Sequence, residues 1–493
     1  MRAGSGIPLF APACIDEKSC RPRHIRGVPT ILLFDHVVSR LSGAVIGSLP
    51  GRRQIERAGK DVLVSAAPQA FGLLTGLLTS VLVARGLGPK GLGQYALATS
   101  IGAVVGMLSD LGVNQTAIRF ASHAAATLDT TKQFAVLRWA FYLRLCLLSV
   151  FGALGWIAAP GLANSLWREP ELSFLLRLGI LCSGISALGS IPGVYFQSMR
   201  KFGHNATVSI FQKLITLAGI LAIWAMHAWR VDTVLWVSFA SGFFGSIAFL
   251  WLLPKATIFM RRGAGSSETG LSSDPAPAIG TPWHFLKFHV LSTLIVGFTS
   301  QMDVWALGRL LSTTELGLYA AAQRATLPLT ILLSGINTAL WPRASRITDP
   351  NGIKQLLRHS LGVCGGLALG AVVYALFVPR LLPFLFGKPY TASVWTGQIL
   401  CLGWALAILV CPAGIIAYSV GFVRVAWVVN LLQLTVEGAG LLFLIPRFGV
   451  PGAALAFLLQ TITGMGLALV YIIRRVNQLA SPANIEQHGN SCL

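Results

Sequence analysis

Residues 85–98 read Arg-Gly-Leu-Gly-Pro-Lys-Gly-Leu-Gly-Gln-Tyr-Ala-Leu-Ala, and a related stretch returns 224 positions later as residues 309–322, Arg-Leu-Leu-Ser-Thr-Thr-Glu-Leu-Gly-Leu-Tyr-Ala-Ala-Ala. Seven of the fourteen aligned positions are identical, and they include the core Leu-Gly-x-Tyr-Ala. Each copy joins one long apolar segment to the next. Chance likeness between apolar segments is the alternative interpretation, but the shared position in the two halves favours a duplication.

The composition indicates a protein that lies largely within a membrane. Of the 493 residues, 54% are hydrophobic and 11% are charged, whereas a soluble domain carries about 25% charged residues. So few charges cannot cover a water-facing surface, which excludes a soluble enzyme, a disordered protein and a secreted disulfide scaffold. The remaining class is a polytopic membrane protein.

The net charge of +21 does not indicate a nucleic-acid partner. Ten of the 38 Lys and Arg residues lie in the first 60 positions and most others flank apolar runs, as in cytoplasmic loops of membrane proteins. The sequence has no basic stripe with interleaved aromatic residues. The eight cysteines form no Cys-x-x-Cys pair, and Gly86-x-Gly88-x-x-Gly91 lacks a βαβ context. We therefore expect no metal, no cofactor and no catalytic residues.

Twelve segments are apolar over about 20 residues, the length that crosses the hydrocarbon of a bilayer. They are 62–84, 93–113, 134–159, 172–195, 206–226 and 232–253 in the first half, and 285–311, 317–341, 357–379, 392–419, 424–445 and 450–473 in the second. An even number of spans starts both halves on the same side of the membrane. We therefore predict an all-α, polytopic membrane protein with about twelve transmembrane helices in two parallel six-helix repeats.

The segments divide the chain into a basic N-terminal tail (1–60), an N-terminal six-helix lobe (61–253), a linker rich in Gly, Ser and Pro (254–283), a C-terminal six-helix lobe (284–475) and a C-tail (476–493). With the N-terminus in the cytoplasm, the inner loops and C-tail carry thirteen Lys and Arg residues and the outer loops eight. This bias predicts cytoplasmic termini and a cytoplasmic linker. The tail could form a short helix on the membrane surface.

Motifs in both halves point to one family. The segment 84–98 is followed by Ser-Asp-Leu-Gly-Val-Asn-Gln-Thr-Ala-Ile-Arg-Phe at 109–120. The second half holds Met-Asp-Val-Trp-Ala-Leu-Gly-Arg at 302–309, Glu-Leu-Gly-Leu-Tyr-Ala at 315–320 and Leu-Trp-Pro-Arg at 340–343. These motifs resemble those of the polysaccharide transporters in the multidrug, oligosaccharidyl-lipid and polysaccharide exporter superfamily. The resemblance covers about residues 62–475, and the long N-terminal tail departs from the family pattern.

The resemblance implies a flippase and not an enzyme. Such a protein moves an oligosaccharide linked to undecaprenyl pyrophosphate across the bacterial inner membrane, by alternating access of two lobes, for exopolysaccharide, capsule or O-antigen synthesis. The partners that the resemblance implies are this lipid-linked oligosaccharide, the membrane lipids, and a polysaccharide polymerase with its export machinery.

Four cations inside the predicted spans are candidate substrate-binding residues: Arg144, Arg177, Lys213 and Arg324. A cation at mid-bilayer costs about 2.5–3.5 kcal/mol, so we expect these side chains to face a wet interior. A cation-lined cavity suits a pyrophosphate and disfavours a cationic drug. Arg144 is nearest to the middle of its span and has no acidic residue within that span, so we expect it to be the most sensitive to substitution.

Two acids, Asp303 and Glu437, lie inside predicted spans of the second half. Arg324 and Asp303 occupy the outer thirds of neighbouring spans, so an ion pair between them is the alternative to substrate contact. Either acid is also a candidate carrier of a coupling proton, although structural pairing is the favoured role for each.

Two other functions stay open on the sequence. An ion-coupled multidrug antiporter of the same superfamily needs buried carboxylates in its cavity, and the first span, 62–84, contains none. A membrane polysaccharide polymerase or ligase needs a sizeable catalytic loop on the outer face. No predicted outer loop exceeds about 15 residues, so this function is the least favoured.

Overall fold

The structure is a computed structural model that describes residues 52–126, 130–199, 202–252, 282–344, 350–417 and 423–479. The chain divides into two units at Asp61, and the arrangement below concerns the described residues of the unit 62–493. The expectations for the tail before residue 52, for most of the linker 254–283 and for the chain after residue 479 lie outside the described residues.

The described residues are almost entirely helical and contain no β-strand. The α-helices are α2 (Arg52–Asp110), α3 (Val113–Ala126), α4 (Thr130–Gly161), α5 (Leu172–Ser198), α6 (Phe202–Ala225), α7 (Val231–Leu252), α8 (Pro282–Leu310), α9 (Thr313–Ala325), α10 (Leu327–Ala344), α11 (Pro350–Phe386), α12 (Val394–Ala417), α13 (Val423–Phe448) and α14 (Val450–Leu479). A short π-helix, η1 (Leu162–Leu166), follows α4, and a 3-10 helix, η2 (Lys388–Ser393), follows α11.

The predicted all-α polytopic class is confirmed, and all twelve predicted segments fall largely on these helices. Within the described part of the chain, nine helices are long and apolar enough to cross a membrane, or ten if the bent pair α9 and α10 is one span. The number twelve and the division into two six-helix lobes stay predictions.

One predicted boundary agrees with the structure and one predicted segment is broken. The first two predicted segments, 62–84 and 93–113, are the two arms of α2, which is divided at Gly88, where φ is 65° and ψ is 179°. Glycine adopts a positive φ without steric cost, and Pro89 suits the first turn of the helix that resumes. The predicted segment 317–341 is broken at Thr326 into α9 and α10, which are bent by 46°.

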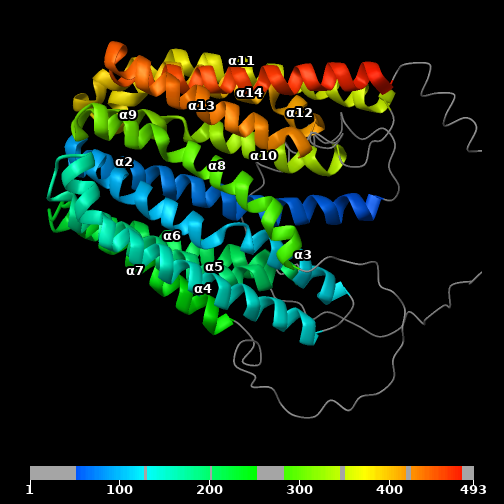
Figure 1. Ribbon diagram of the computed structural model, residues 1–493, viewed down its shortest axis with the longest axis horizontal. Coiled ribbons are helices and arrows are strands. Elements are labelled where there is room, and N and C mark those ends of the chain that lie inside the picture. The colour runs from blue at the N-terminus through cyan, green and yellow to red at the C-terminus, as the bar shows by residue number, and fades with distance from the viewer. Residues whose placement is uncertain are drawn as a thin grey trace, which may run out of the picture. The chain divides into compact units, whose positions relative to one another are not determined.

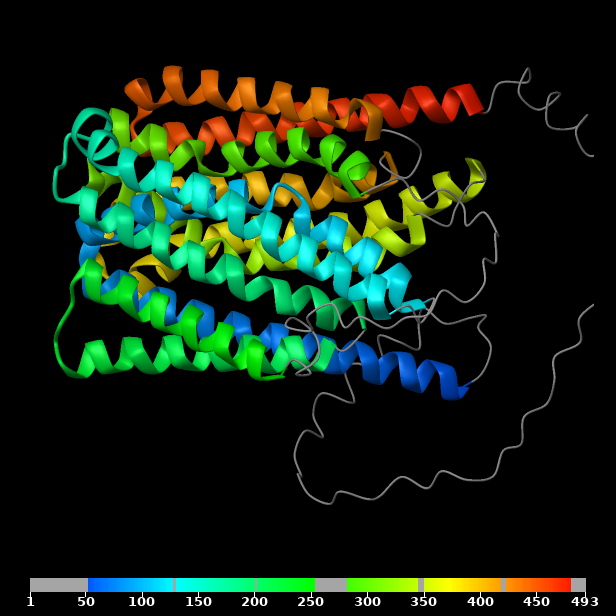
Figure 2. The same ribbon diagram turned by 60° about the horizontal axis from the view of Figure 1, so that its bottom comes forward.

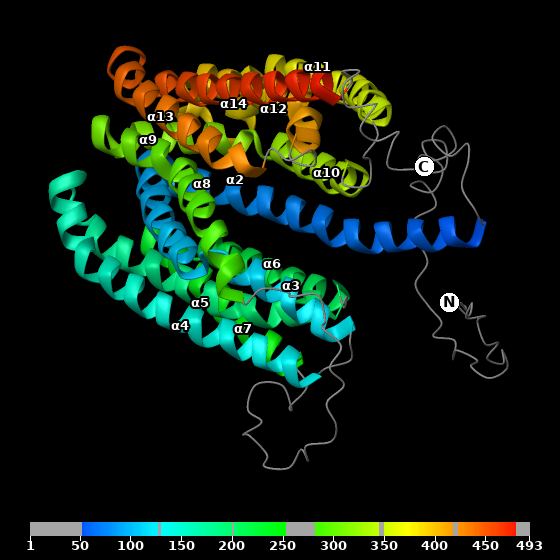
Figure 3. The same cartoon turned by 45° about the vertical axis from the view of Figure 1, so that its right-hand side comes forward.

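Helices α2 and α8 lie between two groups, α4–α7 on one side and α11–α14 on the other (Figures 1 and 3). Within the groups, α5 packs against α4 and α7, and α12 packs against α11 and α14. The connections α4–α5, α6–α7 and α13–α14 gather at one end of the helices (Figure 2). We call this end, marked by Trp167, His227 and Gly449, the connection end.

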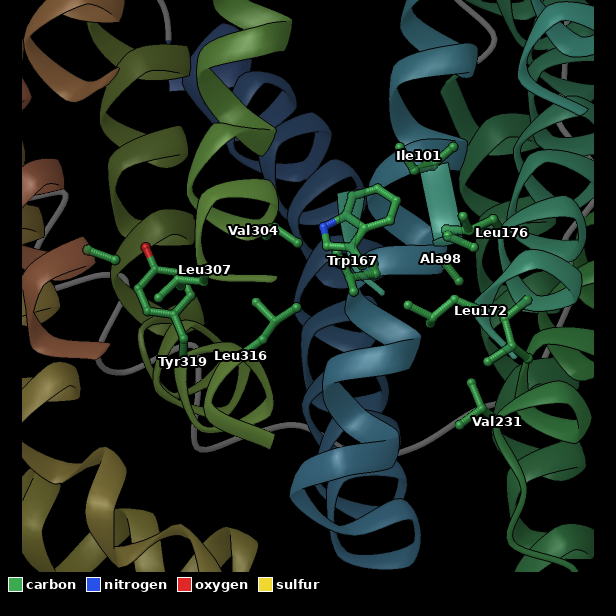
Figure 4. Close-up of a cluster of buried hydrophobic side chains, with 14 of the residues drawn as sticks. Ala98, Ile101, Trp167, Leu172, Leu176, Val231, Val304, Leu307, Leu316 and Tyr319 are labelled. Carbon is green, nitrogen blue, oxygen red and sulfur yellow. The ribbon is translucent and has the colours of Figure 1, made fainter. Parts of the chain in front are cut away.

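An apolar cluster joins the two halves of the sequence. Figure 4 shows Trp167, which follows η1, between Ala98 of α2 and Val304 of α8. Leu316 and Tyr319 of α9 belong to the same cluster, and both side chains are almost fully buried. The two copies of the repeat therefore contribute to one core, which also contains Trp167.

Hydrogen bonds also join the halves, close to the Gly88 interruption of α2. Arg85 donates through Nε to the carbonyl oxygen of Leu385 at 2.7 Å and through Nη2 to that of Phe384. In the opposite direction, the hydroxyl of Tyr390 donates to the carbonyl oxygen of Ala84 at 2.7 Å. These bonds hold α2 against the end of α11 and against η2.

Candidate functional site

A cavity of about 820 Å³ lies between helices of the first half and helices of the second. Its walls come from α2, α6, α8, α9 and α10. The lining residues are Gly72, Leu74, Gly76, Leu77, Ser80, Ala96, Thr99, Lys213, Gln301, Val304, Ala320, Gln323, Arg324, Leu327, Pro328 and Ile331. The walls from α2 and α10 are largely apolar, and the cations come from α6 and α9.

A smaller cavity of about 310 Å³ adjoins the first, because Gly76, Ser80, Lys213 and Arg324 line both. Its other lining residues are Thr79, Val83, Tyr95, Thr216 and Ser238. Among the described residues that line the two cavities, Lys213 and Arg324 are charged and no aspartate or glutamate occurs. The space is therefore positively charged, and it offers hydroxyl and amide groups beside the cations.

Helix α9 is capped at its start and carries Arg324 in its last turn, at the cavity wall. A capping box starts this helix: Ser312 Oγ accepts from the amide of Glu315 at 3.2 Å, and the Glu315 carboxylate accepts from the amide of Ser312 at 3.0 Å. Arg324 lies in the last turn, where a cation stabilises the helix. Its Nη1 donates to the carbonyl oxygen of Ala320 at 3.2 Å, and its Cζ lies 5.8 Å from the centre of the Tyr95 ring.

Lys213 reaches the cavity from α6, and its neighbours fix that helix to α7. Ser241 Oγ donates to the carbonyl oxygen of Gln212 at 2.8 Å, and Thr216 Oγ1 donates to Ser241 Oγ at 2.8 Å. The Lys213 side chain itself is exposed. The structure thus brings two of the four predicted cations, Lys213 and Arg324, to one cavity.

Asp303 lies behind the cavity wall, with an exposed fraction of 7%. Its carboxylate accepts from the hydroxyl of Tyr319 at 2.7 Å, from Gln323 Nε2 at 2.8 Å and from the amide of Val304 at 2.7 Å. None of the ion pairs between described residues joins Asp303 to Arg324. The ion pair considered from the sequence is therefore not formed, because Tyr319 and Gln323 supply the donors that Asp303 needs.

Glu437 on α13 is also buried, with an exposed fraction of 3%. Gln460 of α14 donates to its carboxylate at 3.4 Å, and Gln433 donates to Gln460 Oε1 at 3.4 Å. Helix α13, which carries Glu437, packs against α8, which carries Asp303. Both acids lie inside the second half, and neither lines the cavity.

Arg144 does not line either cavity. Its exposed fraction is 5%, and its Nη1 donates to Asn114 Oδ1 at 2.7 Å and to Ser190 Oγ at 2.6 Å. The same Nη1 lies 3.4 Å from a carboxylate oxygen of Asp110. The Arg144 span contains no acidic residue, as noted from the sequence, and the acidic partner comes instead from the end of α2. Arg144 thus connects α4 to α5 and to the junction between α2 and α3.

Arg177 is also away from the cavities. Its Nε donates to the carbonyl oxygen of Trp156 at 3.4 Å, and its Cζ lies 5.3 Å from the centre of the Trp156 ring. The side chain is partly exposed on the α4–α5 face. Arg177 is therefore separate from Lys213 and Arg324, contrary to the expectation of one shared interior.

Sequence reasoning missed the aromatic groups at this site. Tyr95 faces Arg324 and Tyr319 binds Asp303, and these two tyrosines are equivalent positions of the repeat. The repeat itself was the available signal, because two polar aromatic residues recur inside apolar surroundings. Among the described residues, no group of three His, Cys, Asp or Glu side chains is placed to hold a metal ion.

Comparisons with known proteins identify the family and the fold. Residues 58–348 match the family described as polysaccharide biosynthesis protein. A Shigella flexneri protein named as an O-antigen transporter is 22% identical over 379 residues, which are 75% of this chain and 86% of that protein.

Two solved structures share the fold at 13% sequence identity. One is an inward-facing multidrug resistance transporter of the MATE family, with a TM-score of 0.66 over 85% of this chain and 98% of that chain. The other is the lipid II flippase MurJ in an inward closed conformation, with a TM-score of 0.63 over 85% and 90%. At this identity the likeness concerns the fold alone.

Proposed function

Because the chain belongs to the polysaccharide biosynthesis protein family, we propose that it moves lipid-linked oligosaccharide repeat units across the membrane. The family, the name of the Shigella flexneri relative and the fold agree on a multi-pass membrane transporter and not an enzyme. The proposed substrate is an oligosaccharide on undecaprenyl pyrophosphate, and the proposed location is the bacterial inner membrane with both termini in the cytoplasm.

One observation carries the proposal: the cavity between the halves has two cations and no acid among its described lining residues. A diphosphate bears negative charge that guanidinium and ammonium groups bind with short, charge-assisted hydrogen bonds. In this mechanism Arg324 and Lys213 hold the diphosphate, and Gln301, Gln323 and Thr99 offer hydrogen bonds to sugar hydroxyl groups. The two halves then rock against each other and expose the cavity to one side at a time.

The four predicted cations take different parts in this proposal. Arg324 and Lys213 bind substrate. Arg144 and Arg177 have other contacts, which favour a structural role for Arg144 and a role at the membrane-facing surface for Arg177. Asp303 and Glu437 stay the candidate carriers of a coupling proton, since both are buried and neither pairs with a described cation.

An ion-coupled multidrug antiporter fits this cavity less well. A cationic drug would meet two positive charges and no carboxylate on the described walls. The likeness to multidrug transporters is a likeness of fold, and folds of this kind host several substrates.

The test uses cells in which this chain is the source of transport. We expect Arg324→Ala to lower surface polysaccharide about tenfold, because a charge-assisted hydrogen bond contributes about 1.5–3 kcal/mol, and to leave lipid-linked repeat units on the inner leaflet. Arg324→Lys keeps the charge and loses the planar fork, so a partial defect is expected. Lys213→Ala should also lower surface polysaccharide. Arg447→Ala, which removes an exposed cation outside the cavity, is the matched control. Full transport by a stably inserted double variant of Arg324 and Lys213 would contradict the proposal.

A further inference from the structure

A second hollow lies on the outside of the first half, away from the transport cavity. It is a groove of about 410 Å³ between α4, α5 and α7. The α4 wall runs from Leu148 to Trp156, the α5 wall runs from Ile180 to Leu188, and Phe239 closes it from α7. Every lining residue except Ser149 is apolar.

Glycines create the hollow. A Cβ atom on Gly152 of α4 would have no neighbour within 4 Å, and one on Gly184 of α5 would first meet Leu148 at 3.7 Å. The outer side of α4 is widely exposed, for example at Leu154 (58%) and Ile157 (75%). In a protein that spans a membrane, an open apolar groove on such a face is filled by lipid chains, because close-packed apolar surfaces exclude voids.

Arg177 lies at the end of this groove nearest to the α4–α5 connection. It is four residues before Leu181 and eleven before Leu188, so the three positions share one face of α5. Its guanidinium lies over the ring of Trp156, the groove residue of α4 nearest to that connection. None of the ion pairs between described residues includes Arg177, and its Nη groups donate to no described residue.

The dimensions fit one acyl chain of one leaflet. From Ile180 to Leu188 the helix rises by eight steps, or about 12 Å, and one leaflet of hydrocarbon is about 15 Å thick. Arg177 lies about 8 Å inside the start of α5, so its long side chain reaches the headgroup level. The groove therefore runs from headgroup depth toward the middle of the bilayer, with a cation at its polar end.

We propose that the groove and Arg177 form a binding site for an anionic phospholipid of the surrounding membrane. One acyl chain lies between α4 and α5 beside Gly152, and the phosphate accepts from the guanidinium of Arg177, which Trp156 holds in place. In the predicted topology the lipid belongs to the outer leaflet. This site is independent of the proposed transport function, since it shares no residue with the transport cavity.

The test uses the full-length protein in nanodiscs that contain equal amounts of phosphatidylglycerol and phosphatidylcholine. After gentle extraction, native mass spectrometry counts the lipids that each variant retains. We expect the wild type to retain phosphatidylglycerol in preference, and Arg177→Gln to lower that preference about fivefold, which corresponds to one cation near an anionic membrane. Arg380→Gln removes another exposed cation, on α11, and should change nothing.

Gly152→Leu tests the groove itself. Gly152 lines the groove and a Cβ atom there has no neighbour within 4 Å, so we expect retention of bound lipid to fall while thermal stability is kept. Gly370→Leu on α11, where a Cβ also has no neighbour within 4 Å, is the matched control. If Gly152→Leu does not accumulate, Ala153→Leu fills the same groove from an exposed position.

Three results would overturn the site: equal retention of the two lipids by the wild type, the same loss in Arg177→Gln and Arg380→Gln, or unchanged retention in Gly152→Leu. A change from dimer to monomer in Gly152→Leu, with lipid retention unaltered, would assign the face to a second copy of the chain instead.

Discussion

Gly93 of α2 and Gly317 of α9 face each other where the two copies of the repeat cross. A Cβ atom on Gly93 would run into the carbonyl group of Thr313 and lie 3.0 Å from the amide nitrogen of Gly317. A Cβ atom on Gly317 would run into the carbonyl group of Pro89 and lie 3.1 Å from the amide nitrogen of Gly93. Pro89 and Thr313 are themselves equivalent in the repeat. Such reciprocal contacts are expected for two copies related by a two-fold axis.

Enlarging either glycine should therefore separate the copies. We expect Gly93→Val and Gly317→Val each to lower the free energy of unfolding by about 1–3 kcal/mol, the usual cost of overpacking, because backbone atoms stand in the way. The measurement is thermal unfolding of the purified protein. Gly366→Val on α11 is the control, since a Cβ there has no neighbour within 4 Å. Equal stability of Gly93→Val and the control would show that the crossing is looser than described.

Arg144 should act through stability and not through substrate contact. We expect Arg144→Ala to destabilise the protein by about 1.5–3 kcal/mol, because charge-assisted bonds to Asn114, Ser190 and Asp110 are lost. Transport per molecule of inserted protein should stay close to the wild-type value. The measurements are thermal unfolding and transport corrected for protein amount. A stable but inactive Arg144→Ala variant would instead return Arg144 to the substrate path.

Asp303 and Arg324 should behave as independent residues. Tyr319→Phe removes a donor to the buried Asp303 carboxylate, so we expect a loss of about 1–3 kcal/mol in the free energy of unfolding. Combining Asp303→Asn with Arg324→Ala should give the sum of the two single effects on transport, because the two side chains form no ion pair. The measurement is a double-mutant cycle on transport with and without an imposed proton gradient. Recovery of activity in the double variant would mean that an ion pair forms during the cycle.

The connection end should face away from the cytoplasm. Trp167 packs beside Gly308, and Gly387 begins the connection that Arg85 and Tyr390 hold to α2. The predicted topology places both connections outside the cytoplasm, so reporter fusions after Trp167 and Gly387 should give a periplasmic signal. Fusions after Arg262 and Arg475 should give a cytoplasmic one, as the Lys and Arg bias requires. A periplasmic signal after Arg262 would exclude two parallel six-helix halves.

Much of the fold could be predicted from the sequence, because each span is recognised as a run of about 20 apolar residues. The break of α2 at Gly88 could also be predicted, because residues 85–92 contain Arg, Lys, Pro and three glycines and separate two apolar segments. The bend at Thr326 between α9 and α10 could not, because it falls inside one predicted segment, 317–341. Hydropathy measures the preference of a segment for lipid, and a bend leaves that preference unchanged.

The candidate site could be predicted in part. The cost of a cation in lipid predicts polar surroundings for Arg324 and Arg144, and the structure places Arg324 at the cavity and Arg144 beside Asn114 and Ser190. The cost does not distinguish a cation that faces a cavity from one that meets Asp110 of a different helix, because both solutions remove the same penalty. Whether a cation faces the cavity or pairs with an acid depends on which helices pack side by side, and hydropathy alone does not predict helix packing.

The hydrogen bonds that join α2 to the end of α11 and to η2, here called the clamp, constrain which substitutions related proteins can accept. The acceptors of the clamp are the backbone carbonyl groups of Ala84, Phe384 and Leu385, and only Arg85 and Tyr390 contribute side chains. Since every residue carries a carbonyl group, selection on the clamp acts at the two donor positions and leaves the acceptor positions free to vary in chemistry. A deep mutational scan should show this asymmetry as intolerance at 85 and 390 beside broad tolerance at 384, where the side chain points away with an exposed fraction of 74%.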